Sequence, residues 1–370
     1  MAIVEHSEFA PLSNVVEPEW WHGTRPIDAT DYTVDATDFD MTDLSYDSAL
    51  GVAMRRTYDR VGLVHVTNSG LSELSDMRRV AKLVIGAEMS YEGGANPRGN
   101  IEPNVYEIGA PLSAWLHYHH EMAYVGRSTR VISFLAKDVL PQATDDPSAT
   151  VAGGGLGASR GATFVSDSIG ATDRLLATDF GRKLKDLGLC YHRNLTDRDA
   201  YIDKTEYGVY NHWQTSFETD DPEVAATRAR NQRLAVDWGA DRLLKTRYYC
   251  SAFEYFPGLD RNVLYSSLAD HGMWFDTWPL VQHLPYEERP LHMTFGDDSE
   301  ISADEIQEWI DLYDDFGMPI DWNEGDVGVI CNYRWAHGRP GIRLADGERR
   351  KLGVVLGDQY DRVGVVSNRW

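Results

Sequence analysis

The chain has 370 residues and a formal net charge of −23, and hydrophobic and charged residues make up 42% and 25% of it. This composition is typical of a globular protein, and its acidity disfavours binding to the phosphate backbone of nucleic acids. Three widely separated cysteines provide neither a disulfide framework nor a CxxC metal motif. No signal-peptide pattern and no apolar run long enough to span a bilayer is present, which predicts a cytoplasmic protein without a membrane partner.

The first part of the chain divides into a polar segment and a region of alternating helix and strand patterns. Residues 1–40 are acidic and predict an extended N-terminal arm, followed by a single domain over residues 41–370. Apolar periodicity then predicts helices over 45–61 and 74–86 and, between them, a strand over 62–67. His65 lies in this strand without an acidic residue two positions later, so we expect it to be structural.

The middle of the chain combines two predicted strands with a long loop. Residues 130–136 predict a buried strand, 161–168 a second strand, and 141–160 the loop. Gly153-x-Gly155-x-x-Ala158 in this loop matches a dinucleotide-binding fingerprint. No predicted strand leads into it and no predicted helix follows, so we do not expect a nucleotide site there.

Helix signals and short β runs alternate in the C-terminal part. The pattern predicts a helix over 223–234, a strand over 263–266, a helix that begins at the capping box Ser302–Glu305 and ends at Gly317, and β runs over 326–330 and 352–356. The last two runs are expected to flank a turn that contains His337. Short strands thus dominate a chain with helical insertions, which predicts a mainly β (α+β) fold with a single sandwich or jelly-roll core.

Two imidazoles and one carboxylate in this pattern predict a metal site. Residues i and i+2 of a strand point to the same face, so His119 and Glu121 can be directed at one point. His337 follows an apolar strand and is the candidate for the third ligand. Two His and one carboxylate form the facial triad of non-haem iron(II) oxygenases, which leaves three positions open.

The first pair alone is a weak signal. His6-Ser7-Glu8 has the same spacing, but it lies in the polar arm outside any predicted strand. The neighbouring His117 and His120 compete with His119, but neither has a carboxylate two residues later. The specificity comes from the order of the whole pattern, in which the His-x-Glu pair precedes His337-Gly338-Arg339 and then an arginine before an apolar strand.

The arginine has a physical role if 2-oxoglutarate is the co-substrate. This molecule chelates iron through its 1-carboxylate and 2-keto oxygens, so its distal carboxylate needs a buried guanidinium. Strand alternation favours Arg350, and a register slip of one residue would favour Arg349 instead. Thr163 could add a hydroxyl donor, although on spacing alone a threonine that simply favours a β-strand is the more ordinary interpretation.

Several segments together resemble the taurine dioxygenase-like enzymes. The resemblance is to the branch with His-x-Glu, typified by the syringomycin-biosynthesis aspartyl β-hydroxylase and clavaminate synthase-like proteins. The segments that carry it are His119-His120-Glu121-Met122-Ala123-Tyr124, Gly161-Ala162-Thr163-Phe164-Val165-Ser166-Asp167-Ser168, Trp213-Gln214-Thr215-Ser216-Phe217-Glu218-Thr219, and Trp322-Asn323-Glu324-Gly325-Asp326 with Asn332 and His337-Gly338-Arg339. Three departures affect the substrate more than the metal, namely the long loop before Thr163 with its Gly153–Gly157 cluster, Cys331 before Asn332 where Asp is common, and His120 where the branch has Asn.

The resemblance implies a double-stranded β-helix fold and an oxidoreductase that uses Fe(II), 2-oxoglutarate and O₂. It implies metal ligands at His119, Glu121 and His337 and 2-oxoglutarate contacts at Thr163 and Arg350. The implied reaction oxidises an unactivated C–H by hydroxylation, with desaturation or cyclisation as variants, and releases succinate and CO₂. Glu121 argues against halogenation, because halogenating relatives lack this carboxylate.

The implied substrate is an amino acid or an amino-acid-derived natural-product intermediate, free or presented on a carrier protein. The candidate substrate contacts are Tyr124, Trp213, Arg339 and Arg343. Two other functions fit the same fold, namely a redox-neutral metal-dependent lyase, isomerase or hydrolase, and a non-catalytic binding protein. The sequence does not predict the oligomeric state.

Overall fold

The protein is described by a computed structural model that covers residues 27–91, 93, 100–102, 105–107, 116–140, 161–200, 212–272, 282–339 and 346–370. Within these residues the helices are α1 (Ala29–Tyr32), α2 (Ala49–Val61), α3 (Leu74–Ala81), α4 (Ser168–Leu176), α5 (Asp179–Leu187), α7 (Trp213–Ser216), α8 (Pro222–Asn231) and α9 (Ala303–Asp315), with a 3₁₀ turn η5 (Leu268–His271). No helix in this part of the chain is long and apolar enough to cross a membrane.

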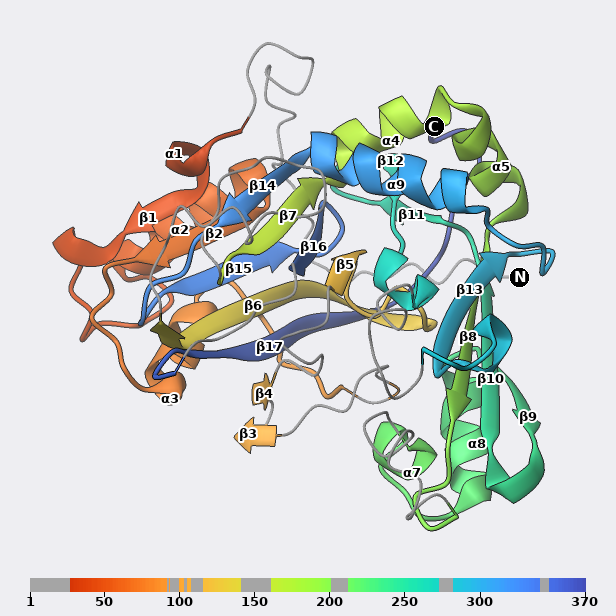
Figure 1. The fold of residues 1–370 in the computed structure, drawn as a ribbon. Coiled ribbons are helices and arrows are strands. Elements are labelled where there is room, and N and C mark those ends of the chain that lie inside the picture. Colours follow the sequence, from red (N-terminus) through yellow and green to blue (C-terminus); the bar gives the residue numbers. More distant parts are fainter. Residues whose placement is uncertain are drawn as a thin grey trace.

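Two sheets that face each other form the core, as the jelly-roll prediction requires (Figure 1). The major sheet has the strand order β1 (Thr33–Asp35), β2 (Leu63–Thr67), β15 (Val327–Cys331), β6 (Arg127–Leu140), β17 (Arg349–Asp361), β4 (Val105–Glu107) and β3 (Asn100–Glu102). The minor sheet has the order β14 (Gly317–Ile320), β7 (Thr163–Asp167), β16 (Trp335–Arg339) and β5 (Leu116–His119). These sheets confirm the mainly β, double-stranded β-helix architecture.

A third sheet lies to the side of this core and is called the distal sheet below (Figure 1). Its strand order is β13 (Leu291–Phe295), β8 (Leu189–Leu195), β10 (Leu244–Cys250) and β9 (Ala235–Trp238). The hairpin of β11 (Phe253–Phe256) and β12 (Arg261–Leu264) completes the strands. Strand β8 reaches the core through Tyr191, whose hydroxyl accepts a hydrogen bond of 2.9 Å from the backbone N–H of Ser267.

Local sequence explains where the helices begin and end. Ser48 caps the start of α2, and Gly62 ends it with a φ of 70°, a left-handed conformation that favours glycine. Ser302 and Glu305 form the predicted capping box of α9. The helix predicted over 74–86 ends early, at Ala81, because the next residues form tight turns in which the N–H of Leu83 bonds to the carbonyl of Val80.

The described structure also settles some of the other predictions. His65 is structural, since its Nε2 lies 2.9 Å from the carboxylate of Asp326. The prediction that His337 lies in a turn is wrong, because the chain forms strand β16 there, between β5 and β7. The loop over 141–160 lies outside the described residues. Within the predicted arm, strand β1 pairs in parallel with β2. The division of the chain into an arm and a domain at residue 40 stays a prediction.

Candidate active site

Two neighbouring strands of the minor sheet bring the three predicted metal ligands together. His119 ends β5 and Glu121 follows two residues later, whereas His337 lies on β16. The antiparallel register pairs His337 directly with His119, so the two imidazoles leave the sheet side by side, with ring centroids 4.2 Å apart. The ring of Phe134 on β6 of the major sheet lies 5.4 Å from that of His337, which places the group between the two core sheets.

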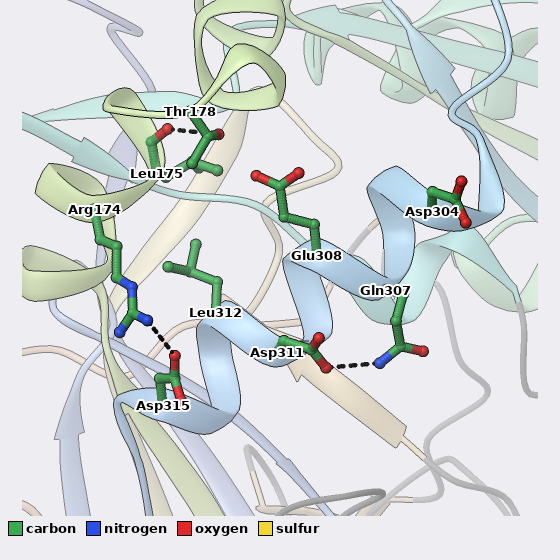
Figure 2. A pocket seen from close by; sticks show the side chains of 9 residues that line it. All are labelled: Arg174, Leu175, Thr178, Asp304, Gln307, Glu308, Asp311, Leu312 and Asp315. Carbon is green, nitrogen blue, oxygen red and sulfur yellow. Dashed lines mark hydrogen bonds and ion pairs between the residues drawn. The ribbon is translucent and has the colours of Figure 1, made fainter.

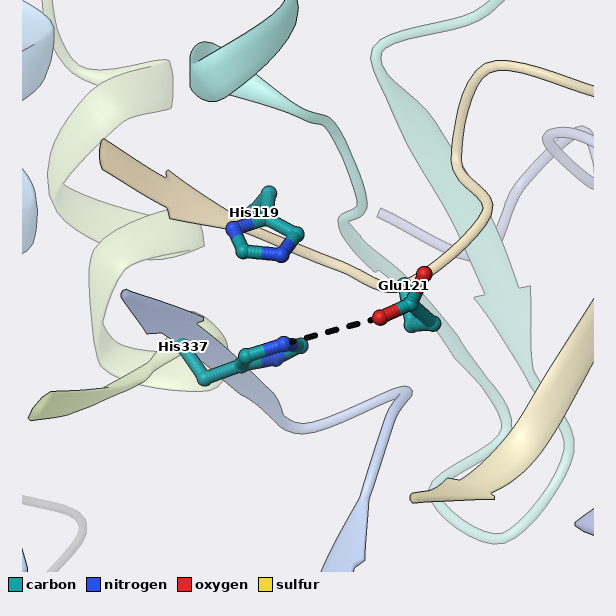
Figure 3. A group of neighbouring side chains, drawn as sticks. All are labelled: His119, Glu121 and His337. Carbon is teal, nitrogen blue, oxygen red and sulfur yellow. Dashed lines mark ion pairs between the residues drawn. The ribbon is translucent and has the colours of Figure 1, made fainter. Parts of the chain in front are cut away.

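The three side chains converge and are almost completely buried (Figure 3). Their potential ligand atoms all lie within 4.8 Å of one another, and His337 Nε2 is 3.8 Å from Glu121 Oε2. Nitrogen and oxygen donors at this spacing suit a divalent transition metal, and two His with one carboxylate suit iron(II) in particular. The residues present therefore fit an iron ion, which would also neutralise the buried carboxylate.

Hydrogen bonds behind the ligands fix their orientation. His119 Nδ1 donates to the carbonyl oxygen of His117 at 2.9 Å, which leaves Nε2 with its lone pair for a metal. Asn332 holds the backbone of Glu121 from both sides, because its Oδ1 accepts from the N–H at 2.8 Å and its Nδ2 donates to the carbonyl at 2.9 Å. The amide of Asn332 thus positions the carboxylate without touching the metal.

Replacing Asn332 by alanine is expected to lower the affinity for Fe(II) by about 10- to 100-fold, the usual effect of losing a residue that orients a ligand. Anaerobic metal titration measures this. Asn262→Ala is the matched control, because Asn262 is equally buried and bonds through both amide atoms to Val366, in the C-terminal segment. Equal losses of metal affinity in both variants would mean that Asn332→Ala acts by destabilising the whole fold and not by misplacing Glu121.

A second group of predicted residues lies next to the metal ligands, where 2-oxoglutarate is expected. Thr163 begins β7, and its hydroxyl accepts a hydrogen bond of 2.9 Å from Trp322 Nε1. The Trp322 ring lies 6.0 Å from that of Phe134, the same ring that contacts His337. The Thr163 hydroxyl is therefore held in the space between the sheets and still has its own proton to donate.

Arg350 contacts the chain two residues before Thr163 and has one guanidinium nitrogen that is not hydrogen-bonded in the described structure. Its Nε donates to the carbonyl of Gly161 at 2.9 Å, and its Nη2 is buried without a hydrogen-bond partner in the described structure. Burial and, second, the nearby Arg339 lower the pKa of Arg350 to about 9, so it remains a cation at neutral pH. A buried guanidinium beside a second one gains most from an anionic ligand.

Arg349, the alternative anchor, points away from the site. Its side chain is 60% exposed, and its Nε lies 3.8 Å from Asp138 Oδ1. The alternation along β17 thus separates the two arginines onto opposite faces of the strand. The geometry favours Arg350 for the 2-oxoglutarate carboxylate.

The four predicted substrate contacts differ in their surroundings. Tyr124 is buried, and its hydroxyl lies 2.8 Å from that of Tyr91. Trp213 begins α7 and packs edge-on against Trp238 at 5.6 Å, which is a packing contact at the distal sheet. Arg339 is buried on β16, and burial lowers its pKa to about 10. Arg343 lies outside the described residues, so substrate contact by these residues stays a prediction.

Two charged residues beside the site were not predicted from sequence. Arg193 of β8 stacks its guanidinium 3.7 Å from the centre of the Tyr124 ring, and its Nη2 lies 3.7 Å from Asp270 Oδ1 of η5. The turn η5 joins the minor sheet through a bridge between Ser267 and His119. Neither residue stands in a local motif, so only the three-dimensional structure brings them to the metal ligands.

Two other features compete less well as functional sites. Cys190, His192 and Asp298 also come within ligand distance of one another, but His192 Nε2 already bonds to Thr294 at 3.0 Å and Asp298 is exposed. A cavity of about 380 Å³ lies between α4 and α9 and is lined by acidic side chains, one of which pairs with Arg174 (Figure 2). It contains none of the predicted site residues.

Comparison with known proteins identifies the family. The chain belongs to the TauD, TfdA family described as taurine catabolism dioxygenase, which matches residues 24–356. It is therefore a 2-oxoglutarate-dependent non-haem iron dioxygenase, an oxidoreductase that uses Fe(II), 2-oxoglutarate and O₂. The predicted family, enzyme class and cofactors are thus confirmed, whereas the narrower syringomycin-type branch stays a prediction.

The individual relatives share little sequence with this chain. A clavaminate synthase-like protein from Arabidopsis thaliana is 25% identical over 269 residues, 72% of each chain. A taurine dioxygenase structure from Burkholderia xenovorans has a TM-score of 0.49 and 14% identity, covering 92% of this chain and 90% of the other. The structure of AAD-2 with Mn(II) and N-oxalylglycine has a TM-score of 0.44 and 13% identity, covering 94% and 98%.

Proposed function

We propose that this dioxygenase oxidises an unactivated C–H bond of an amino acid or an amino-acid-derived natural-product intermediate, by hydroxylation in the simplest case. The observation that carries the proposal is the buried convergence of His119, Glu121 and His337 between the core sheets. The family supplies the reaction class, and the side chains around this group supply the arguments for the individual roles.

In this proposal the three converging side chains hold Fe(II) from one side and leave the other side for ligands. A bound Fe(II) ion would supply O₂ activation: 2-oxoglutarate would be oxidised to succinate and CO₂ with one oxygen atom of O₂, and the other atom would be available to hydroxylate the substrate C–H. Arg350 holds the distal carboxylate of 2-oxoglutarate through its open Nη2, and Thr163 donates its hydroxyl proton to the same group. Glu121 fills the position that a halide would need, so we expect hydroxylation rather than halogenation.

The test is an anaerobic titration of metal-free protein with Fe(II) and then 2-oxoglutarate. A weak visible charge-transfer band of the chelate is expected in the wild type and not in His337→Ala. A fully metallated wild type without this band would contradict the assigned site and leave a redox-neutral metal enzyme as the better hypothesis. Succinate formation with pools of free amino acids then tests the substrate class.

A further inference from the structure

The side chains of Arg193 and Asp270 form a pair of opposite charges at the edge of the active site. Arg193 lies on β8, and Asp270 lies in η5, three residues after the Ser267 that bridges to His119. Glu121, Arg193 and Asp270 all lie close enough to Tyr124 to influence its pKa, which burial, Tyr91 and Glu121 raise well above its usual value. The pair therefore lies near Glu121, one of the three candidate metal ligands.

The guanidinium of Arg193 is held in place but not fully bonded. Its Cζ lies over the Tyr124 ring, 3.7 Å from the ring centre, and its Nη1 donates to the carbonyl of Gly93 at 2.9 Å. Its Nε and Nη2 are buried and have no hydrogen-bond partner in the described structure. These two atoms form one edge of the guanidinium, the edge that accepts a carboxylate in bidentate geometry.

Asp270 is likewise bonded on one side only. Its Oδ2 accepts a hydrogen bond from the hydroxyl of Ser267, and its Oδ1 is buried without a hydrogen-bond partner in the part of the chain described. Burial raises its pKa to about 6, against the opposing effect of Arg193. The distance of 3.7 Å from Oδ1 to Arg193 Nη2 is too long for a hydrogen bond.

A buried ion pair that serves the fold needs close contacts and satisfied polar atoms, and this pair leaves three polar atoms open. A ligand with one negative and one positive group would satisfy all three. A carboxylate fits the Nε–Nη2 edge of Arg193, and an ammonium fits Asp270 Oδ1. An α-amino acid carries both groups on one carbon atom, a spacing that suits two neighbouring side chains.

We infer that Arg193 and Asp270 bind the carboxylate and the ammonium of a free α-amino acid and so position its side chain for oxidation. The inference rests on the proposed function and narrows it. An amino acid tethered to a carrier protein as a thioester has no carboxylate, so it would leave the Arg193 edge unpaired. The structure thus favours a free substrate over a tethered one.

The experiment compares wild type with Arg193→Gln, Arg193→Lys and Asp270→Asn. The probes are the twenty proteinogenic L-amino acids and their methyl esters, added to the anaerobic Fe(II)–2-oxoglutarate complex and then to aerobic turnover. We expect at least one free amino acid to shift the visible band and to stimulate succinate formation. Its methyl ester, Arg193→Gln and Asp270→Asn should each raise the half-saturating concentration about 100-fold, and Arg193→Lys about tenfold.

Separate readouts distinguish this inference from the proposed function. The band formed by Fe(II) and 2-oxoglutarate alone should persist in all three variants, which also shows that they fold, and its absence in wild type would contradict the metal site instead. Arg261→Gln, which loses a partly exposed ion pair with Asp173, is the control variant. The inference is overturned if no free amino acid affects the wild type, if esters act as well as free acids, or if Arg193→Gln responds normally.

Discussion

His337→Ala is expected to lower the rate of 2-oxoglutarate turnover by at least about 10³-fold. This corresponds to a loss of roughly 4 kcal/mol in transition-state stabilisation. His337 is the only one of the three converging side chains that comes from a distant part of the sequence. Without it, His119 and Glu121 bind a metal from one segment alone, which leaves the geometry on the other side undefined. Succinate formation at saturating Fe(II) measures the loss.

His120→Asn is the matched control for this prediction. His120 is as buried as the candidate ligands and lies next to one of them, but its Nε2 lies 2.9 Å from the Ser168 hydroxyl, and burial lowers its pKa to about 3. We expect this variant to keep most of the turnover with some loss of stability. Equal losses in both variants would mean that any buried histidine in this region supports the fold, and the assignment of His337 as a ligand would not stand.

Arg350→Ala is expected to raise the half-saturating concentration of 2-oxoglutarate by about 100-fold while leaving Fe(II) binding unchanged. Removing one partner of a buried, hydrogen-bonded charge pair costs about 2–5 kcal/mol. Arg350→Lys should recover only part of the affinity, because an ammonium cannot form the bidentate contact. The anaerobic band at increasing 2-oxoglutarate concentrations measures the affinity directly.

Arg349→Ala provides the neighbouring comparison, because the Arg349 side chain is mostly exposed and pairs only loosely with Asp138. We expect it to change the 2-oxoglutarate affinity by less than about threefold, as is usual for a surface ion pair. The reverse result, with Arg349→Ala impaired and Arg350→Ala normal, would show that the assignment of the two faces of β17 is wrong.

Much of the core was predictable because its signals are local. The capping box at Ser302, the glycine after α2 and the apolar runs of β6 and β15 are each encoded by a few adjacent residues. The His119–Glu121 pair was predictable from its spacing, although β5 ends at His119 and Glu121 lies in the turn that follows. The pairing of His337 with His119 was not, since register between strands distant in sequence depends on tertiary packing.

The charged pair of Arg193 and Asp270 beside Tyr124 could not be predicted from the sequence. Arg193 lies in a strand among polar residues, and Asp270 lies in a single 3₁₀ turn, so neither position has a periodic pattern. What distinguishes them is burial with unsatisfied hydrogen-bonding atoms, a property that exists only after the chain has folded. The role of Asn332 also becomes visible only in the folded chain, because its amide bonds to Glu121 across a long stretch of sequence.

The distal sheet has a consequence for how this enzyme could diversify. The candidate iron and 2-oxoglutarate residues lie on strands of the two core sheets or, for Glu121, in the turn after β5, whereas Arg193 extends from the distal sheet. Substitutions on β8 and its neighbours can therefore alter which molecule is admitted without disturbing the residues that perform the oxidation. Descendants of this chain could acquire new substrates through one peripheral element while inheriting the same reaction.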